Sequence, residues 1–359
     1  MRIALLPVLC MLCPLAGFAG SEIESSASRW SEAKASYWYQ RQPWLVGCNY
    51  IPSTAANQLE MWQAETFDAA TIDRELGWAA ALGMNTVRVY LHDLPWVTNW
   101  DGFRTRINTF LDIADKHKIV TIFVLFDDCW NPAPQQGPQP EPVPGVHNSR
   151  WVQSPGAKVV ADPDLWPRIE RYVREVVRAF ASDRRILMWD LYNEPGNSAL
   201  GKKSLPLLEK VFEWARQVGP VQPLTSAVYD GGDDDIADFQ IENSDVITFH
   251  SYEGEEQLID RIKKLKKESR PVICTEWLAR TRGSVVSTHL PVFKKERVGC
   301  INWGLVAGKT QTIYPWDSPE GGAAPEVWFH DLLKKDGAPF DSTEAEVFRT
   351  LTGKIPPAQ

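Results

Sequence analysis

The segment Ile186-Leu-Met-Trp-Asp-Leu-Tyr-Asn-Glu-Pro195 predicts a short buried strand that ends in an amide, a carboxylate and a proline. Its apolar start is typical of a parallel strand that is covered on both faces. Pro195 lacks the amide hydrogen that a continuing ladder needs, so the strand stops there. Asn193 and Glu194 are therefore expected at the carboxyl end of the strand, where parallel α/β folds carry their chemistry.

A second segment, Pro271-Val-Ile-Cys-Thr-Glu-Trp277, predicts another buried strand that ends in a carboxylate, Glu276. Glu194 and Glu276 are too distant along the chain to form a local pair. The ends of two strands in a parallel barrel, however, face each other across its mouth. Two carboxylates that flank one bond are what glycoside hydrolysis uses, one as a protonated acid and one as an ionised nucleophile or base.

Together, Leu191-Tyr-Asn-Glu-Pro195 and Thr275-Glu-Trp277 resemble the motifs of clan A of the retaining glycoside hydrolases, and most closely family 5, the cellulase and mannanase group. The resemblance covers roughly residues 40–310. It implies a (β/α)8 barrel in a single domain, with Glu194 as acid/base and Glu276 as nucleophile. It also implies that neither a metal nor an organic cofactor is required.

Three further residues have types that suit this chemistry. Arg88 interrupts an apolar run, and a buried arginine must be paired. The pairing is either a structural ion pair or, as the resemblance implies, a hydrogen bond that holds the carboxylate of Glu276 ionised. His250 and Tyr252 are two residues apart on a predicted strand and share a face. The resemblance implies that they orient the two glutamates, with Tyr252 bonded to Glu276; the alternative for His250 is a packed, hydrogen-bonded residue.

The remaining candidate contacts are expected to bind sugar. The resemblance implies that Asn193 holds a 2-hydroxyl and that Trp303 forms the floor under the sugar, because an aromatic face packs well on pyranose C–H groups. The third predicted strand is followed by Asp127-Asp128-Cys129-Trp130, where family 5 commonly carries a histidine. The chain departs from the family there and offers Asp127 or Asp128 instead. Asp128 and Trp130 are the expected substrate contacts.

Residues 131–167 form a long predicted loop that contains nine prolines. Loops of this length are usually functional or disordered. This one follows a strand on the catalytic face and carries Trp151 and Trp166, so we expect a wall of the substrate cleft. The alternative is a stiff flap that does not contact substrate. An open cleft would favour internal cleavage of a chain, and a pocket closed by this loop would favour cleavage at its end.

The rest of the chain alternates strand and helix patterns. Further strands are predicted at 44–51, 85–91, 119–126, 223–229, 245–252 and 299–305. Helices are predicted at 66–82, 103–117, 204–218, 255–268, 285–296 and 326–333, and one more helix begins at Asp164. The acidic segment 230–235 lacks the ligand spacing of a calcium loop and is expected to be a solvated turn.

The N-terminus has the pattern of an export signal. Residues 1–20 combine Arg2, an apolar core and small residues before a cleavage site, and the apolar stretch is short for a membrane span. We expect a signal peptide at 1–20, a spacer at 21–36, a catalytic domain at 37–359 and a secreted or periplasmic product.

The mature chain keeps four cysteines, Cys48, Cys129, Cys274 and Cys300, which we expect to be buried thiols. Export makes a disulfide possible, and the pair to test is Cys274 with Cys300.

Charge and composition restrict the possible partners. Lys and Arg number 38 against 46 Asp and Glu, a net charge of −8, which disfavours nucleic acid and anionic membranes as partners. We expect a monomer with a carbohydrate substrate. The predicted function is retaining hydrolysis of a β-linked polysaccharide or oligosaccharide of the mannan, xylan or glucan type. The alternatives are an exo-acting β-glycosidase on short oligosaccharides and a non-catalytic carbohydrate-binding barrel.

Overall fold

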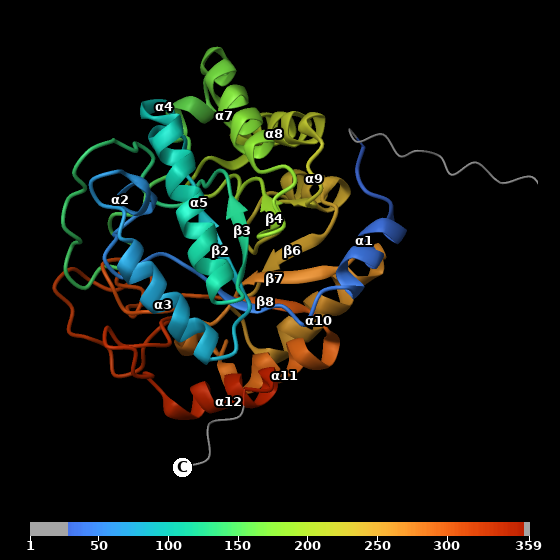
Figure 1. Ribbon diagram of the computed structural model, residues 1–359. Helices are drawn as coiled ribbons and strands as arrows, with labels where there is room; N and C mark the ends of the chain where they lie inside the picture. Colours follow the sequence, from blue (N-terminus) through green and yellow to red (C-terminus); the bar gives the residue numbers. More distant parts are fainter. Residues whose placement is uncertain (1–27, 355–359) are drawn as a thin grey trace, which may run out of the picture.

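Eight parallel strands form an inner barrel in the computed structural model, which describes residues 28–354 (Figure 1). Their spatial order is β5-β4-β3-β2-β1-β8-β7-β6, and a parallel bridge between Val228 and Phe249 joins the two outer strands and closes the barrel. The strands are β1 (Val46–Asn49), β2 (Thr86–Tyr90), β3 (Val120–Val124), β4 (Ile186–Asp190), β5 (Leu224–Thr225), β6 (Ile247–His250), β7 (Val272–Glu276) and β8 (Gly299–Trp303). The predicted fold class is therefore confirmed.

An outer helix follows each strand and covers the barrel. The apolar stripe of α7, for example, is fully buried, whereas its charged residues face outward, as expected for an amphipathic helix on a sheet. The outer helices are α3 (Ala69–Ala81), α5 (Trp100–Lys116), α7 (Trp166–Ala179), α8 (Leu205–Val218), α9 (Asp234–Asn243), α10 (Glu255–Leu265), α11 (Val286–Glu296) and α12 (Ser342–Thr352). Short helices in the loops are α2 (Gln58–Trp62), α4 (Asp93–Thr98) and α6 (Ala157–Val160).

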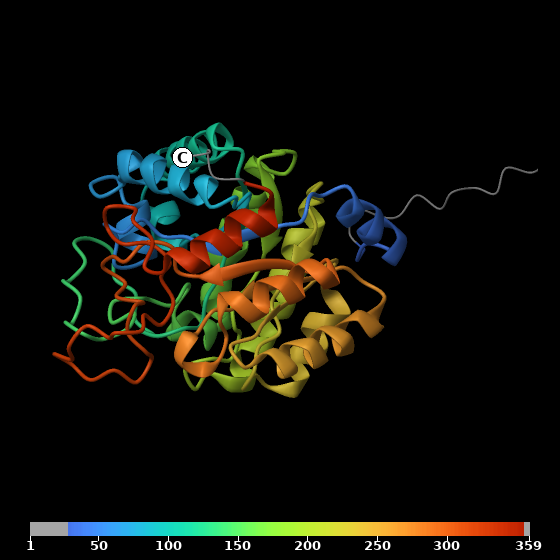
Figure 2. The same cartoon turned by 90° about the horizontal axis from the view of Figure 1, so that it is seen from below.

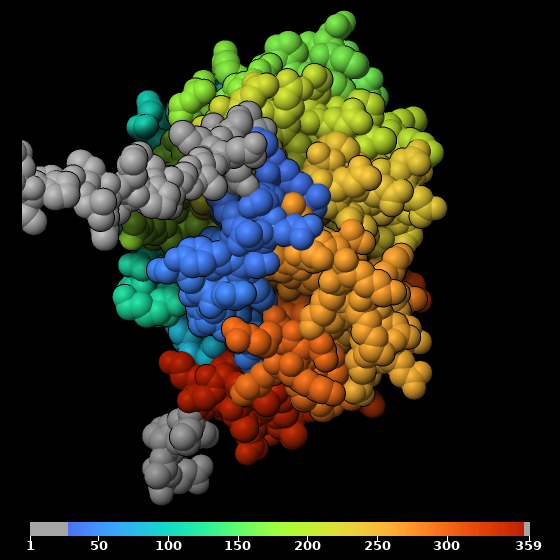
Figure 3. Space-filling view, turned by 90° about the vertical axis from the view of Figure 1, so that its right-hand side faces the viewer, coloured from blue at the N-terminus to red at the C-terminus, as the bar shows by residue number. Residues whose placement is uncertain are grey.

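Helix α1 (Glu32–Gln40) closes the end of the barrel at which the strands begin. Its Trp38 and Tyr39 pack against the apolar cluster inside that end, and the hydroxyl of Tyr39 accepts a hydrogen bond of 2.9 Å from the amide of Gly299. Figure 3 shows this N-terminal segment, in blue, seated among later parts of the chain. The boundary predicted between residues 36 and 37 therefore falls inside a helix of the barrel. The predicted signal peptide at 1–20 and residues 21–27 lie outside the described residues.

One prediction about a helix is wrong, and one about a turn holds only in part. Residues 326–333 are irregular, because their backbone pairs with other loops, including a bridge between Val306 and Leu333; the last helix is α12, capped by the side chain of Asp341. The acidic segment 230–235 is only partly a turn, because α9 begins at Asp234 with Asp233 as its N-cap. Only Ile236 and Gln240 of α9 are buried, and an apolar periodicity that would predict this helix is correspondingly weak in its sequence.

The four described cysteines are free thiols. Cys274 and Cys300 are neighbours in register on β7 and β8, but they do not form the disulfide that the sequence left open. Within residues 28–354, no helix combines the length and the apolar character that crossing a bilayer requires.

Candidate active site

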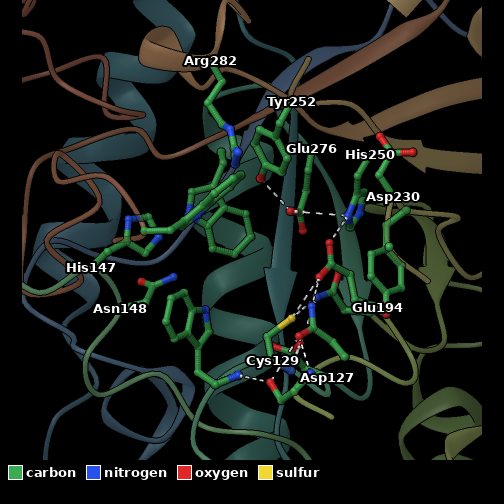
Figure 4. A pocket seen from close by; sticks show the side chains of 18 of the residues that line it. Asp127, Cys129, His147, Asn148, Glu194, Asp230, His250, Tyr252, Glu276 and Arg282 are labelled. Atoms are coloured by element: carbon green, nitrogen blue, oxygen red, sulfur yellow. Dashed lines mark hydrogen bonds and ion pairs between the residues drawn. The ribbon is translucent and has the colours of Figure 1, made fainter. Parts of the chain in front are cut away.

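A pocket with a volume of about 870 Å³ opens at the carboxyl ends of the strands (Figure 4). This volume lies within the range of about 300–1,000 Å³ that is typical of small-ligand sites. Both glutamates singled out by the sequence line it, Glu194 just beyond β4 and Glu276 at the end of β7. The barrel thus brings together two carboxylates that are far apart in the chain.

The two carboxylates lie close enough to act on one bond. An oxygen of Glu194, an oxygen of Glu276 and a ring nitrogen of His250 are all within 4.8 Å of one another. Nδ1 of His250 is 2.7 Å from Oε1 of Glu194 and 3.5 Å from Oε2 of Glu276. The side chain of Glu194 is 13% exposed and that of Glu276 is 6% exposed, so both reach the pocket from largely buried positions.

Three donors hold the carboxylate of Glu276. Its Oε1 accepts hydrogen bonds from Nη1 of Arg88 at 2.8 Å and from the hydroxyl of Tyr90 at 2.9 Å. Its Oε2 accepts the hydroxyl of Tyr252 at 2.7 Å, as the sequence predicts. The sequence reasoning missed Tyr90, although the signal was present, because residues two apart on a strand share a face and Tyr90 follows Arg88 at that spacing.

Arg88 is fully buried and bonded on every side. Besides Glu276, its guanidinium forms an ion pair with Asp190 at 2.8 Å and donates to the side-chain oxygens of Asn49 at 2.9 Å and Asn193 at 2.7 Å. Burial raises the pKa of Asp190 to about 6, and the neighbouring Arg88 opposes that rise. Asp190 lies at the end of β4 and was also missed by the sequence reasoning. Arg88 therefore serves both as a structural ion pair and as a donor to Glu276.

Glu194 occupies a strained position at the end of β4. Its φ is +44°, in the left-handed region that costs a non-glycine residue about 1–2 kcal/mol. Burial raises the pKa of Glu194, whereas hydrogen bonds to its Oε2 from Cys129 at 3.3 Å and Asn197 at 2.5 Å lower it. Removal of the carboxylate from water is therefore the main cause of its raised pKa.

His250 is a neutral imidazole near neutral pH, because burial lowers its pKa to about 4. Its Nε2 has no hydrogen-bond partner among residues 28–354. Glu194, His250 and Glu276 have ligand types that a divalent cation accepts. Glu276, however, is already ion-paired with Arg88, so the cluster suits proton transfer and nucleophilic attack by the carboxylates better than it suits a metal.

Asn193 lines the pocket, but its amide is already hydrogen-bonded. Its Oδ1 accepts from Arg88, and its Nδ2 donates to Oδ1 of Asp127 at 2.9 Å. Asp127 in turn accepts the indole N–H of Trp151 at 2.7 Å. Asn193 therefore links Arg88 to the segment after β3, in addition to any contact it makes with a ligand.

The prediction that Asp128 contacts substrate is wrong. Its side chain is fully buried and absent from the pocket wall, where Asp127 lies instead. It accepts hydrogen bonds from the hydroxyls of Tyr192 at 2.7 Å and Ser204 at 2.5 Å and from the amide of Gly196 at 2.8 Å. Asp128 thus secures the loop that follows Glu194.

Four tryptophans line the pocket. Trp303 ends β8 and packs edge-on against Tyr90, with ring centres 5.8 Å apart; the others are Trp130, Trp151 and Trp316. The long loop 131–167 contributes His147, Asn148 and Trp151, so it forms the wall that the sequence predicts. Trp166 lies elsewhere, with its indole bonded to the carbonyl of Val159.

Comparisons with known proteins gave structural matches only. No protein-family model matches the sequence, and no curated protein matches it. Many solved structures are similar, and the following three are among them. GH5_18 from Streptomyces cattleya in complex with GlcNAc has 15% identity and a TM-score of 0.58, with 88% of this chain and 82% of that chain covered. An endo-β-1,4-mannanase from Thermotoga petrophila has 14% identity and a TM-score of 0.56, with coverages of 86% and 76%.

An exo-β-1,4-mannosidase from Opitutaceae bacterium strain TAV5 has 18% identity and a TM-score of 0.57, with coverages of 86% and 60%. The chain therefore shares the barrel fold of these enzymes.

Proposed function

We propose that the protein is a retaining β-glycoside hydrolase with Glu276 as nucleophile and Glu194 as acid/base. The observation that carries the proposal is the pair of carboxylates, with oxygens within 4.8 Å, at the centre of a tryptophan-lined pocket. Retaining enzymes place the two carboxyl groups about 5–5.5 Å apart, whereas inverting enzymes need about 6.5–9.5 Å to admit a water. The short separation supports retention.

In the first step, an oxygen of Glu276 forms a bond to the anomeric carbon as the glycosidic C–O bond breaks. Arg88, Tyr90 and Tyr252 fix the carboxylate for this attack, so little reorganisation is needed as its charge is consumed. Glu194 gives its proton to the leaving oxygen. Its raised pKa keeps that proton available in mildly acidic solution.

In the second step, the ionised Glu194 removes a proton from water. The resulting hydroxide oxygen bonds to the anomeric carbon and releases Glu276. Neutral His250 lies within hydrogen-bond distance of Glu194, so it orients the carboxyl group without adding a positive charge that would favour early loss of the proton. Neither step requires a metal or an organic cofactor.

The substrate class in this proposal is a β-linked polysaccharide or oligosaccharide of the mannan, xylan or glucan type. Tryptophan faces suit the apolar C–H faces of such sugars. Two of the similar structures are named as a β-1,4-mannanase and a β-1,4-mannosidase, so β-mannosides are the first substrates to test. A binding protein without activity would not need both glutamates at the pocket centre.

The test combines aryl β-glycosides with chemical rescue. We expect Glu194→Gly and Glu276→Gly each to lower turnover by at least about 10²- to 10⁴-fold. Azide then distinguishes their roles. In Glu276→Gly it occupies the nucleophile's place and yields an α-glycosyl azide; in Glu194→Gly it replaces the second-step water and yields a β-glycosyl azide.

Glu253→Gly is the matched control, because Glu253 lines the same pocket without touching the catalytic pair. It is expected to keep most of the activity and to form no azide product. Full activity in either catalytic variant would refute the assignment of the two glutamates, and an inverted sugar product from the wild type would refute retention.

Export through the predicted signal peptide at 1–20 and a monomeric state belong to the same proposal. Sequencing the N-terminus of the protein recovered outside the cytoplasm tests the first, with a start near residue 21 expected. The mass measured by light scattering tests the second.

A further inference from the structure

The chemistry of the proposed function fixes which side of the pocket holds which part of a substrate. The acid/base must lie beside the leaving oxygen, so the leaving group extends past Glu194. The sugar that is attacked lies on the other side, over Glu276 and against Trp303. In Figure 4, His147 and Asn148 lie on the side of the pocket opposite Glu194 and Asp230. His147 and Asn148 therefore mark the end of the pocket that receives the attacked sugar.

That end is closed by two loops, which we call the clasp (residues 143–151, after β3, and 308–322, after β8). Hydrogen bonds join them: Asn148 N to Thr310 O at 2.8 Å, Gln311 Nε2 to Val143 O at 2.7 Å, and Gly321 N to Pro144 O at 2.7 Å. Figures 1 and 2 show the green and red loops together at one end of the barrel. The clasp is thus a continuous wall rather than two separate flaps.

The side chains on this wall are buried. His147 is 1% exposed, Asn148 2% and Trp151 3%. Nδ1 of His147 is 2.7 Å from the carbonyl of Tyr314, so this nitrogen carries the proton and Nε2 is left as an acceptor. The amide of Asn148 points into the pocket in Figure 4, and its Oδ1 has no hydrogen-bond partner among the described residues.

The cavity that adjoins this wall is too small for a second sugar. The next cavity, which shares Asn148, Trp151 and Trp303 with the pocket, has a volume of about 20 Å³. Such a volume holds about one water molecule. On the side of Glu194 in Figure 4, by contrast, Asp230 lines the pocket and is exposed to solvent.

We propose that the enzyme acts only at the non-reducing end of its substrate and releases one sugar in each turnover, with Asn148 and His147 binding the hydroxyls of that terminal sugar. This inference rests on the proposed function and adds its cleavage mode. A terminal sugar fits between the clasp and the glutamates, while the remaining chain leaves through the open side. An internal sugar would have to pass through the wall.

The first experiment uses hexaoses that are labelled at the reducing end. They are built from the sugar whose aryl β-glycoside the full-length enzyme cleaves. We expect free monosaccharide and labelled pentaose as the first products. A hexaose methylated on the terminal 4-hydroxyl should remain intact. Early labelled trioses or tetraoses, or cleavage of the methylated hexaose, would overturn the inference while leaving the hydrolase intact. Inactivity on every aryl β-glycoside would instead overturn the proposed function and this inference with it.

The second experiment tests the wall residue. Asn148 has a φ of +47°, so Asn148→Gly removes the amide without adding backbone strain. We expect kcat/KM on the hexaose to fall roughly tenfold, as for one lost hydrogen bond. Ser269→Gly, at φ +55° in the exposed turn that follows α10, makes the same backbone change at a residue that does not line the pocket and should leave kcat/KM unchanged. Equal values for the two variants would overturn the role of Asn148.

Discussion

Tyr90 is the residue beside the proposed catalytic pair whose effect is easiest to isolate. Its hydroxyl accepts a hydrogen bond from Arg88 at 2.6 Å and donates one to Glu276 at 2.9 Å, so it joins the guanidinium to the proposed nucleophile. In the proposed mechanism Tyr90 is a positioning residue, because it acts on the substrate through Glu276.

We predict that Tyr90→Phe lowers kcat about tenfold, because Glu276 loses one of its three donors, with little change in KM. Steady-state kinetics on an aryl β-glycoside measures both. Tyr172→Phe is the control, since Tyr172 is equally buried but its hydroxyl makes only a 3.5 Å contact with Leu125, outside the pocket. The prediction is wrong if kcat in Tyr90→Phe matches that of the control variant.

At the scale of elements, the clasp depends on a close approach of two backbones. Gly145 has a φ of +80°, and a Cβ there would lie 2.8 Å from the amide nitrogen of Gly322. Gly137, in the same loop, has a φ of +100° but no heavy atom within 4 Å of its Cβ position. Alanine at the two sites therefore adds backbone strain at both but a steric clash only at Gly145.

We predict that Gly145→Ala opens the clasp and raises KM several-fold, with faster hydrogen exchange at the amide of Asn148, which donates to Thr310 in the closed clasp. Gly137→Ala should lose about 1 kcal/mol of stability without a change in KM. Kinetics and exchange mass spectrometry on both variants test this. A KM that rises equally in both would mean that strain alone, and not closure of the clasp, is responsible.

Strands were easier to predict than the remaining elements. Each strand is a short apolar run that is buried on both faces, a pattern carried by the residues themselves. Helix α1 lay in a segment that looked like a spacer, because its role is to cover the end of a barrel built by residues that come later in the chain. Residues 326–333 have helical composition, but their backbone bonds are made to distant loops, such as Phe329 N to Ile313 O.

At the scale of the whole molecule, several buried carboxyl groups affect stability. Burial raises the pKa of Asp128 to about 7 and that of Asp331 to about 6, against 3.8 for either group in water. Between about pH 4 and its folded pKa, each of these two groups therefore binds more protons in the folded protein than in the unfolded chain. In that window its contribution to the free energy of unfolding falls as pH rises, and above it the group adds no further slope. The buried histidines act in the opposite direction, because burial lowers the pKa of His147 and of His250 to about 4.

We predict that Asp128 makes a contribution to the unfolding free energy that declines from pH 4 to pH 7, by at most a few kcal/mol. Relative to the wild type, Asp128→Asn should therefore gain unfolding free energy as pH rises, by up to about 1.4 kcal/mol per pH unit, whatever its effect on absolute stability. Denaturant unfolding across this range provides the measurement. Asp101→Asn is the control, because its side chain is 85% exposed, and it should keep the wild-type dependence of unfolding free energy on pH. The prediction is wrong if Asp128→Asn also keeps that dependence.

The sequence alone determined the positions of the strands and of the two glutamates at their ends, and its resemblance to family 5 implied the barrel. The strands and their ends are local properties, because an apolar run predicts a buried strand and a polar residue that follows it lies at the strand's carboxyl end. Tertiary structure decided what surrounds those carboxylates.

Arg88 reaches Glu276 across 188 residues and His147 reaches Tyr314 across 167, so the partners of Glu276 and the wall formed by the clasp depend on contacts between distant segments. For the same reason, the burial that raises the pKa of Glu194 and removes Asp128 from the pocket follows from how the loops pack, which no local pattern specifies.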